Sequence, residues 1–313
     1  MEWFRNPQSK LETTLRLPIL IKYSLILLVT RILPRLFIFG IIIYFMSGNL
    51  WLSATTAFLV TFLIEMFTLR AWLLNVILPR HLKNLETVRR MLNDLDKDSS
   101  ADLIKKIEDS VKFSSWAIIN IGYVALPSYG WEIIFKFAHK LLVGRAIPYQ
   151  ELLIGFYNKS IEADQALWKV AQERNVSRKS FLRSKFLNEY GSRVDDIDLS
   201  KPTLREQPQV VDQLIQLYKN TISPKARLQE AAAKRQKAEA ELWSKLFIPK
   251  YLFLPFLRTV QKNVQLREDR RFWEFLMDFY IRQMLFKLAV LRGVKRQMIF
   301  TKSWRNLKHA ATN

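Results

Sequence analysis

Cysteine is absent from the 313-residue sequence, and this excludes disulfide bridges, thiol nucleophiles and thiolate metal sites. An extracellular scaffold held by disulfides is excluded with them, and a reducing cytoplasmic setting fits the composition. Glycine and proline are also scarce, with 8 and 11 residues, and most of the remaining sequence is compatible with helices. We therefore expect an all-α protein.

Acidic residues are few compared with basic ones: 28 aspartates and glutamates stand against 49 lysines and arginines, a formal net charge of +21. This balance favours anionic partners, such as phosphate-bearing ligands or acidic lipid. Nucleic acid is not an expected partner, because no base-reading motif accompanies the charge. Apolar residues make up 50% of the chain, which supplies a packed core and excludes disorder of the whole chain.

A long segment without formal charge occupies residues 36–64. A helix needs only about 20 apolar residues to cross a bilayer core, so a membrane segment is the leading interpretation. The Ser-Gly-Asn sequence at residues 47–49 suits a tight turn near the middle of this segment. We therefore predict a helical membrane hairpin within residues 1–81, whose first helix reaches back to Ile19 and whose second helix covers residues 50–78.

Basic residues flank the predicted hairpin on both sides, while its central turn carries no charge. Because cytoplasmic flanks of membrane helices are rich in lysine and arginine, both ends of the hairpin and the C-terminal domain are expected in the cytoplasm. Glu65 lies inside the second helix, so either that helix shifts toward the membrane surface there or Glu65 has a partner. Two alternatives stay open: a pair of buried helices in a soluble bundle, and an interfacial hairpin inserted halfway.

Residues 82–143 are predicted to form linker helices and a short apolar segment. The Asp-Ser-Ser sequence at residues 98–100 can cap a helix, since these side chains accept hydrogen bonds from the first N–H groups of a helix. The uncharged stretch 116–131 is short for a membrane span and is interrupted by Pro127 and Gly130. We interpret it as a core or interfacial segment.

Three sequence blocks follow from residue 144 onward. Residues 152–162 read LLIGFYNKSIE, residues 190–208 read YGSRVDDIDLSKPTLREQP, and residues 266–286 read LREDRRFWEFLMDFYIRQMLF. In this order they resemble the central helical region of ATP-dependent dikinases, especially rifampin-phosphotransferase-like and phosphoenolpyruvate-synthase-like proteins. The positions that match the family in the first two blocks are Leu152, Leu153, Gly155, Phe156, Asn158, Glu162, Tyr190, Gly191, Arg193, Asp196, Ile197, Asp198, Pro202, Arg205, Glu206 and Pro208.

The sequence also departs from that family. The tryptophan of the family's Arg-Trp pair is replaced around residues 204–206, its usual glutamate is Asp196, and the acidic turn is slightly shorter. Neither the ATP-grasp domain nor the domain with the phosphorylated histidine occurs in this sequence. His81, His139 and His309 lie outside any glycine-rich loop that could hold a phosphate, and we interpret each as a surface or interfacial residue.

The acidic turn around Asp196 and Asp198 has three interpretations. It is a rigid connection between helices, balanced by Arg193 and Lys201 and stiffened by neighbouring prolines. The resemblance implies a second role, because in the family this turn faces the region where the domains meet around the acceptor. Coordination of Mg²⁺ by the carboxylates is the third. The substrate-side or domain-docking residues predicted from the resemblance are Asn158, Glu162, Arg193, Asp196, Asp198, Arg205, Arg267 and Arg271; no catalytic or metal-binding residue is predicted.

No nucleotide-binding loop, zinc-ligand spacing or Gly-x-Ser-x-Gly nucleophile occurs in the sequence, so a self-sufficient enzyme is disfavoured. The resemblance implies a membrane-anchored, non-catalytic or acceptor-binding subunit of a split phosphotransferase system, with an amphiphilic or lipid-like acceptor. Separate ATP-grasp and phosphohistidine-domain polypeptides would bind ATP and Mg²⁺, and this chain alone would bind no cofactor. The alternative is a membrane scaffold or assembly protein that reuses the helical fold of residues 144–313 without phosphotransfer.

Overall fold

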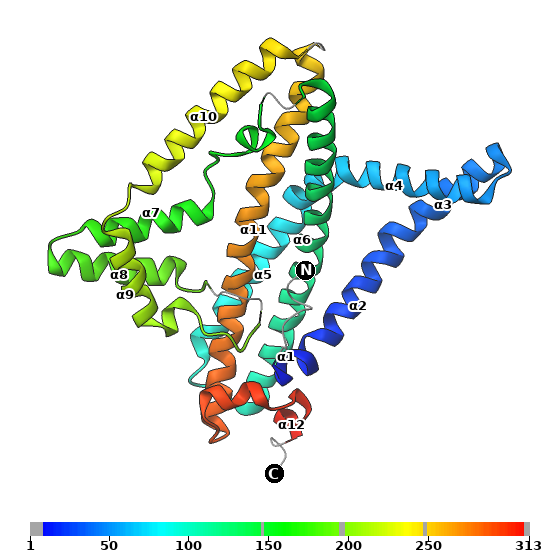
Figure 1. Cartoon of the computed structure of the whole chain (residues 1–313). Coiled ribbons are helices and arrows are strands. Elements are labelled where there is room, and N and C mark those ends of the chain that lie inside the picture. The colour runs from blue at the N-terminus through cyan, green and yellow to red at the C-terminus, as the bar shows by residue number, and fades with distance from the viewer. Residues whose placement is uncertain (1–8, 145–146, 194–197, 247–248, 310–313) are drawn as a thin grey trace. The chain divides into compact units, whose positions relative to one another are not determined.

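The computed structural model describes residues 9–144, 147–193, 198–246 and 249–309. The side chains at positions 62, 63, 66, 67, 69, 70, 123–128, 252, 268, 270, 271 and 309 lie outside this description. Most described residues are helical and none of them forms a β-strand, so the expected all-α class is confirmed (Figure 1).

The α-helices are α1 (Lys10–Leu15), α2 (Leu17–Leu27), α3 (Leu33–Ser47), α4 (Leu50–Trp72), α5 (Leu78–Met91), α6 (Ser100–Leu142), α7 (Lys159–Gln172), α8 (Val176–Tyr190), α9 (Pro208–Tyr218), α10 (Pro224–Lys245), α11 (Lys250–Leu291) and α12 (Trp304–His309). Short π-helices are η2 (Leu28–Ile32) and η3 (Leu73–Ile77). Short 3₁₀-helices are η4 (Leu92–Asp94), η5 (Tyr149–Leu153), η6 (Leu204–Glu206) and η7 (Arg296–Thr301).

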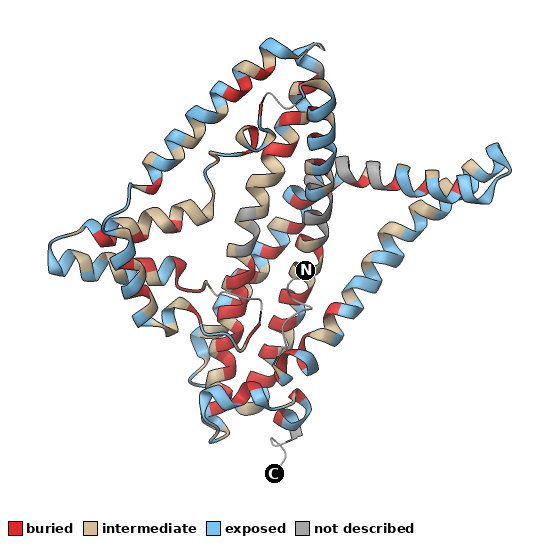
Figure 2. Cartoon of the chain, in the orientation of Figure 1, coloured by how far each residue is buried: buried red, intermediate tan, exposed pale blue. Residues whose placement is uncertain are grey.

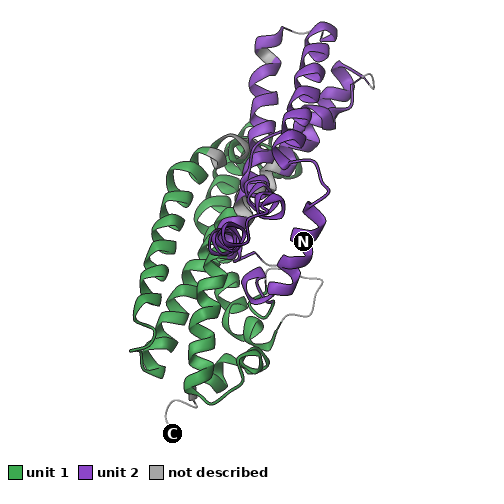
Figure 3. Cartoon of the chain, turned by 90° about the vertical axis from the view of Figure 1, so that its left-hand side faces the viewer, with its two compact units in different colours: residues 1–127, 196–201, 276–313 green, residues 128–195, 202–275 purple. Residues whose placement is uncertain are grey.

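Two compact units are built from segments that alternate along the chain (Figure 3). Unit 1 comprises residues 1–127, 196–201 and 276–313, and unit 2 comprises residues 128–195 and 202–275. Helices α6 and α11 each contribute residues to both units. The sequence analysis instead predicted three consecutive segments, with boundaries after residues 81 and 143. That domain organisation stays a prediction.

A left-handed glycine ends α3 and forms the hairpin turn of unit 1. Gly48 has a φ of 63°, which glycine adopts without a steric penalty. Asn49 then caps α4, because its side-chain oxygen accepts a hydrogen bond from the Leu52 N–H at 3.1 Å. Behind the turn α3 and α4 lie side by side, with the small residues Gly40 and Ala57 facing each other (Figure 1). The turn predicted from the Ser-Gly-Asn sequence is confirmed.

Each arm of the hairpin contains one π-helical turn, and each of these turns precedes a proline. Pro34 follows η2 and Pro79 follows η3. Proline has no N–H and its ring collides with the carbonyl four residues earlier, so a wider turn relieves the clash without ending the helix. As a result the second arm continues through α4, η3 and α5 to Met91, beyond the end predicted at Leu78.

The first arm of the hairpin is long and apolar enough to cross a membrane. Its residues, Leu17–Ser47, have a mean hydropathy of 2.2 over their most apolar part, and none of that part is buried. Apolar side chains near the turn are strongly exposed, and the exposed fraction is 84% for Phe45 and 83% for Trp51 (Figure 2). Exposed apolar surface of this kind is typical of a membrane or partner interface. The helical hairpin is therefore observed, whereas its insertion in a membrane stays a prediction.

The core of unit 1 is formed by side chains from α1, α5, α6, α11, η7 and α12. Buried residues recur at helical spacing, as Leu103, Ile107 and Val111 do on α6, and Ile281 and Leu285 do on α11. Residues four apart lie on one face of a helix, so each helix presents an apolar stripe to the same interior. None of the buried residues of this core lies between residues 17 and 77, where the hairpin exposes its apolar side chains.

Helix α6 begins with a capping box and continues further than predicted. The Ser99 hydroxyl accepts a hydrogen bond from the Asp102 N–H at 3.2 Å, and the Asp102 carboxylate accepts one from the Ser99 N–H at 3.2 Å. Ser99 is thus the cap expected in this stretch. The interruption expected at Pro127 and Gly130 is wrong, because α6 extends to Leu142. A single proline and a single glycine weaken a helix by about 3 and 1 kcal/mol, which a 43-residue helix can offset.

The core of unit 2 brings together α7, α8 and α9. Its buried side chains include Ala163 and Leu167 of α7, Phe186 and Tyr190 of α8, and Val211 of α9. Helix α10 begins after the cap residue Ser223, and its sequence is rich in alanine, glutamate, lysine and other strong helix formers. The helices of unit 2 are therefore placed by local signals that the sequence shows directly.

The loop before α7 approaches the backbone of α10 very closely. Gly155 has a φ of 73°, and a Cβ atom there would lie 2.5 Å from the backbone nitrogen of Ala232. Arg235 of α10 holds the loop by donating hydrogen bonds to the carbonyls of Ile154 and Gly155, both at 2.8 Å. The left-handed glycine interrupts the first sequence block, so that η5 ends at Leu153 and α7 begins only at Lys159.

Replacing this glycine tests the close approach. We expect Gly155→Ala to lower the free energy of unfolding by about 3 kcal/mol, because alanine adds both left-handed strain and a backbone collision. Chemical denaturation followed by circular dichroism measures the change. Gly144→Ala is the matched control, since Gly144 has a φ of 76° and a Cβ there meets nothing within 4 Å. The control should cost only about 1 kcal/mol, and equal losses in the two variants would contradict the close approach.

Candidate functional site

Asn158 and Glu162 both act at the start of α7 in unit 2. The Asn158 side-chain oxygen caps the helix by accepting a hydrogen bond from the Ile161 N–H at 3.0 Å. The Glu162 carboxylate accepts one hydrogen bond from the Tyr190 hydroxyl at 2.7 Å and one from the Lys159 ammonium at 2.8 Å. Since Tyr190 ends α8, the carboxylate joins the two helices.

These contacts fix the protonation states of the pair. Partial burial acts to raise the pKa of Glu162, but hydrogen bonds from Lys159 and Tyr190 outweigh it and lower that pKa below its usual value. Burial and the bond to the carboxylate raise the pKa of Tyr190. At neutral pH the carboxylate is ionised and the phenol keeps its proton. A carboxylate held by several donors is a weak proton acceptor, so this pair positions helices rather than moves protons.

Helix α11 adds a further carboxylate to this group. Asp269 accepts a hydrogen bond from the Lys159 N–H at 2.7 Å, and burial raises the pKa of Asp269. The Lys159 ammonium lies 5.6 Å from the centre of the Phe272 ring. Sequence reasoning missed both Lys159 and Asp269, because charged residues within charged runs give no signal that separates them from solvated ones. We call Asn158, Lys159, Glu162, Tyr190 and Asp269 the α7–α8 cluster.

Arg205 and the backbone of Arg193 close the end of α8. The Arg205 guanidinium donates to the Leu187 carbonyl at 3.0 Å and to the side-chain oxygen of Asn188 at 3.2 Å. The last carbonyls of a helix lack partners within it, so the arginine serves as a C-terminal cap. The Arg193 carbonyl accepts a hydrogen bond from the Leu204 N–H at 3.0 Å. Backbone pairing therefore closes both ends of the acidic turn within unit 2.

Of the two predicted site residues on α11, the structure describes the side chain of Arg267 but not that of Arg271. Arg267 forms an ion pair with Glu132 at 3.0 Å and lies over the Tyr129 ring, 5.2 Å from its centre. The side chain of Arg271 lies outside the described residues, and so does Asp196 as a whole. The structure therefore gathers Asn158 and Glu162 in one cluster, places Arg193 and Arg205 at the end of α8, and gives Arg267 a structural partner.

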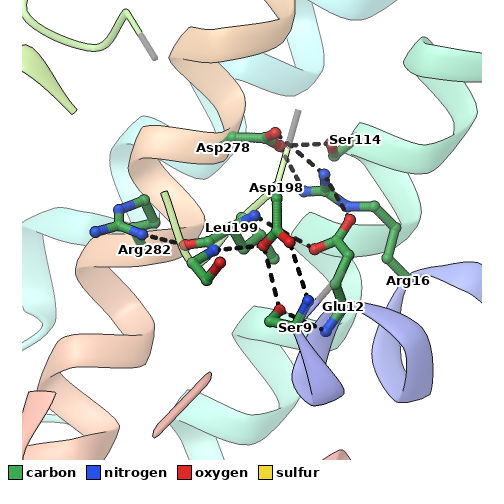
Figure 4. A network of polar contacts seen from close by, with 9 residues as sticks. Ser9, Glu12, Arg16, Ser114, Asp198, Leu199, Asp278 and Arg282 are labelled. Carbon is green, nitrogen blue, oxygen red and sulfur yellow. Dashed lines mark hydrogen bonds and ion pairs between the residues drawn. The ribbon is translucent and has the colours of Figure 1, made fainter. Parts of the chain in front are cut away.

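Asp198 belongs to unit 1, where it lies in a buried polar network (Figure 4). Its carboxylate accepts hydrogen bonds from the Ser9 N–H at 3.0 Å and from the Ser200 N–H at 2.7 Å. Burial acts to raise the pKa of Asp198, but these hydrogen bonds lower it overall. Ser9 is the N-cap of α1, so the described donors to Asp198 differ from the neighbouring Arg193 and Lys201 that the sequence suggested.

The same network buries a complete guanidinium (Figure 4). Arg16 binds Asp278 through Nη2 at 2.5 Å and Glu12 through Nη1 at 3.1 Å, and both Arg16 and Glu12 are fully buried. The Ser114 hydroxyl donates to Asp278 at 3.0 Å. Burial raises the pKa of Glu12 to about 7, although the charge of Arg16 opposes this. In the sequence Arg16 is only one of the basic residues that flank the hairpin, and no local pattern marks its pairing with Asp278.

His81 and His139 are buried, so their interpretation as surface or interfacial residues is wrong. His81 lies on the buried face of α5, one turn before Leu85, and His139 lies 6.0 Å from the Phe135 ring. Burial lowers the pKa of His139, which is therefore neutral at physiological pH. The side chain of His309 is outside the description. Among the described side chains, no three histidines or carboxylates gather in a way that could hold a metal ion.

The segment that holds Tyr190, Arg193, Arg205 and Arg267 runs from α8 into α11. Residues 178–268 match the family described as rifampicin phosphotransferase fourth domain. A comparison with curated proteins gives no match. The fourth-domain segment covers under a third of the chain, including the acidic turn and the start of the third sequence block, and it supports a phosphotransferase-related ancestry. Asn158 and Glu162, from the first block, lie outside it.

The raised pKa of Glu12 predicts a pH-dependent stability. The folded protein holds a proton there up to about pH 7, whereas the unfolded chain releases it near 4.5. The contribution of Glu12 to the free energy of unfolding is therefore fully present below pH 4.5 and is lost as the pH rises through about 7. We expect the wild type to lose about 3 kcal/mol over this range through Glu12. Glu12→Gln keeps the shape without the titration and should not show this loss.

Urea unfolding of the wild type and Glu12→Gln across this pH range measures the difference between their free energies of unfolding. The contributions of all other titrating groups cancel in this difference. Glu86→Gln is the control, because Glu86 is 48% exposed on α5 and should follow the wild-type profile. Parallel profiles for the wild type and Glu12→Gln would contradict the buried, protonated state of Glu12.

Proposed function

We propose that this chain is the membrane-anchored, acceptor-binding subunit of a split phosphotransferase system. The observation that carries the proposal is the match of residues 178–268 to the rifampicin phosphotransferase fourth domain, in a chain that also exposes a long apolar helix. Separate ATP-grasp and phosphohistidine-domain polypeptides bind ATP and Mg²⁺ and carry out the phosphoryl transfer. This chain supplies the anchor and the acceptor side of the reaction.

The hairpin is the anchor in this proposal. A tight turn at Gly48 reverses the chain, so both arms leave the membrane on the side where they entered it. Basic residues precede the first arm and follow the second, which favours the cytoplasmic side for both ends and for the fourth-domain segment. An acceptor with an apolar part, such as a lipid-like alcohol, is the class that an anchored subunit can reach.

The fourth-domain segment supplies the docking surface. Arg205 is exposed and stands at the end of α8, where it also caps the helix. Guanidinium groups suit phosphate and carboxylate partners because their N–H donors lie in one plane. The α7–α8 cluster holds α7 and α8 together and therefore stabilises the helix whose end carries Arg205.

A second candidate function is a membrane scaffold that reuses the helical fold without phosphotransfer. The bonding of the predicted residues favours it. Asn158 caps a helix, Glu162 joins two helices, and Arg205 binds carbonyls at the end of another. Each of these roles is structural, and none requires an acceptor.

Affinity capture of the tagged full-length chain from detergent-solubilised native membranes, followed by mass spectrometry, separates the two functions. The split phosphotransferase predicts that polypeptides with ATP-grasp and phosphohistidine domains are recovered. We expect Arg205→Gln to lower their recovery several-fold, because it removes an exposed donor from the docking surface. Repeated recovery of other membrane proteins in place of these two polypeptides would support the scaffold.

Arg174→Gln is the matched control for this capture. It removes the same charge from an exposed position in unit 2, outside residues 178–268. We expect this variant to recover the partners as the wild type does. Circular dichroism is used to check that Arg205→Gln remains folded, so that a loss of recovery reports on docking.

A further inference from the structure

A cavity of about 550 Å³ lies at the base of the hairpin in unit 1, between residues of α2, η2, α3, α4, α5 and α6. Its walls include three guanidinium groups, Arg31, Arg35 and Arg80, and two indole rings, Trp72 and Trp116. Planar guanidinium groups bind phosphate oxygens through parallel N–H donors and stack on aromatic faces. The side chains that an anion site requires are therefore gathered here.

Stacking and pairing hold these arginines in place. Arg31 lies 3.9 Å from the centre of the Trp72 ring, and Arg80 lies 4.6 Å from that of Trp116. Glu65 pairs with Arg31 at 3.0 Å and also with Arg35. This pairing is the partner that the sequence analysis allowed for Glu65.

The pairing leaves a surplus of positive charge. Among the described residues, Glu65 pairs with two of the three guanidinium groups, those of Arg31 and Arg35, and its side chain is only 6% exposed. Electrostatic attraction is stronger away from bulk water, so a bound anion would gain from this surplus. The side chain of Arg31 is 14% exposed and that of Arg35 is 32% exposed, so both remain within reach of a ligand.

Apolar hollows continue from the cavity along the hairpin. Pro34 lines the cavity and also a second hollow of about 580 Å³. Leu36 and Phe37 line this second hollow and a third one of about 680 Å³ between α3 and α4, whose walls are almost entirely apolar. The succession of a basic cavity and two apolar grooves matches a molecule with an anionic head and apolar chains.

The position of the arginines along the hairpin favours a lipid over a soluble anion. From Arg35 to the turn at Gly48, α3 rises by about 20 Å. One leaflet of a bilayer contributes about 15 Å of hydrocarbon. A hairpin that enters the membrane by its turn therefore brings Arg31, Arg35 and Glu65 to the depth of the lipid phosphates.

We propose that the cavity formed by Arg31, Arg35, Arg80, Trp72 and Trp116 binds the phosphate headgroup of an anionic phospholipid, whose acyl chains lie along the apolar grooves of α3 and α4. Lipid phosphate oxygens accept hydrogen bonds from the guanidinium groups, and the indole rings keep those groups oriented. The inference rests on the membrane association in the proposed function, and it is independent of phosphotransfer.

Native mass spectrometry of the full-length chain, purified in mild detergent and titrated with phosphatidylglycerol or phosphatidylcholine, tests the site. We expect retention of phosphatidylglycerol in preference to phosphatidylcholine. Arg80→Gln and Trp116→Leu should each weaken phosphatidylglycerol binding by roughly tenfold, the equivalent of one charge-assisted hydrogen bond. Arg80 is exposed, so its replacement is expected to leave the fold intact, which circular dichroism verifies.

Arg89→Gln is the charge-matched control, because Arg89 is 69% exposed on the same helix, outside the cavity. It should bind phosphatidylglycerol as the wild type does. An equal loss in Arg89→Gln and Arg80→Gln would overturn the proposal in favour of diffuse attraction to a basic protein. Equal retention of the two lipids would also overturn it, and so would displacement of phosphatidylglycerol by inorganic phosphate at matched concentration.

Flotation with vesicles separates this inference from the anchor on which it rests. The full-length chain should float with vesicles of phosphatidylcholine alone, because the hairpin inserts without help from the cavity. Failure to float would overturn the anchor, and the lipid site with it. Flotation without any preference for phosphatidylglycerol in the titration would overturn the site alone.

Discussion

The buried guanidinium of Arg16 holds together the parts of unit 1 on which the hairpin depends. It binds Asp278 of α11 and Glu12 of α1, while Ser114 of α6 donates to the same Asp278. A charge removed from water costs several kcal/mol unless its partners are in place, so these helices can only assemble together. Because α1 leads directly into α2, this network fixes the point at which the apolar first arm leaves the core. The acidic turn joins it through Asp198, which binds the N-cap of α1.

Local signals in the sequence were sufficient for much of the fold. The turn at Gly48, the cap at Ser99 and helix α10 each follow from residues within a few positions of one another. Contacts between distant residues gave no such signal. Arg16 and Asp278 are 262 positions apart, and nothing near either residue indicates the other. The wrong prediction for the buried histidines has the same cause. The burial of His139 depends on packing that its neighbours in sequence do not reveal.

In the candidate site, too, local signals could be read from the sequence whereas contacts between distant residues could not. The resemblance predicted a substrate-side or docking role for Asn158, Glu162 and Arg205, and that role stays a prediction. Their bonding partners came only with the structure. Lys159 and Asp269 join them through a backbone N–H, a contact that no side-chain pattern predicts. The fourth-domain segment supports a phosphotransferase-related ancestry. Within it, Arg205 binds carbonyls at the end of α8, whereas Asn158, Glu162 and Asp269 lie outside it.

Insertion of the hairpin in a membrane is the claim on which the proposed anchor and the lipid site both depend. The absence of cysteine allows a single nitroxide label at Met46→Cys, near the turn, and a matched label at Val176→Cys in unit 2. The exposed fraction is 82% for Met46 and 81% for Val176, so the protein itself shields them equally. In phospholipid vesicles, collision rates with oxygen and with a polar nickel chelate are then measured by electron paramagnetic resonance. The account predicts that the label at 46 meets oxygen and that the label at 176 meets the chelate; equal access of the chelate to both labels would contradict it.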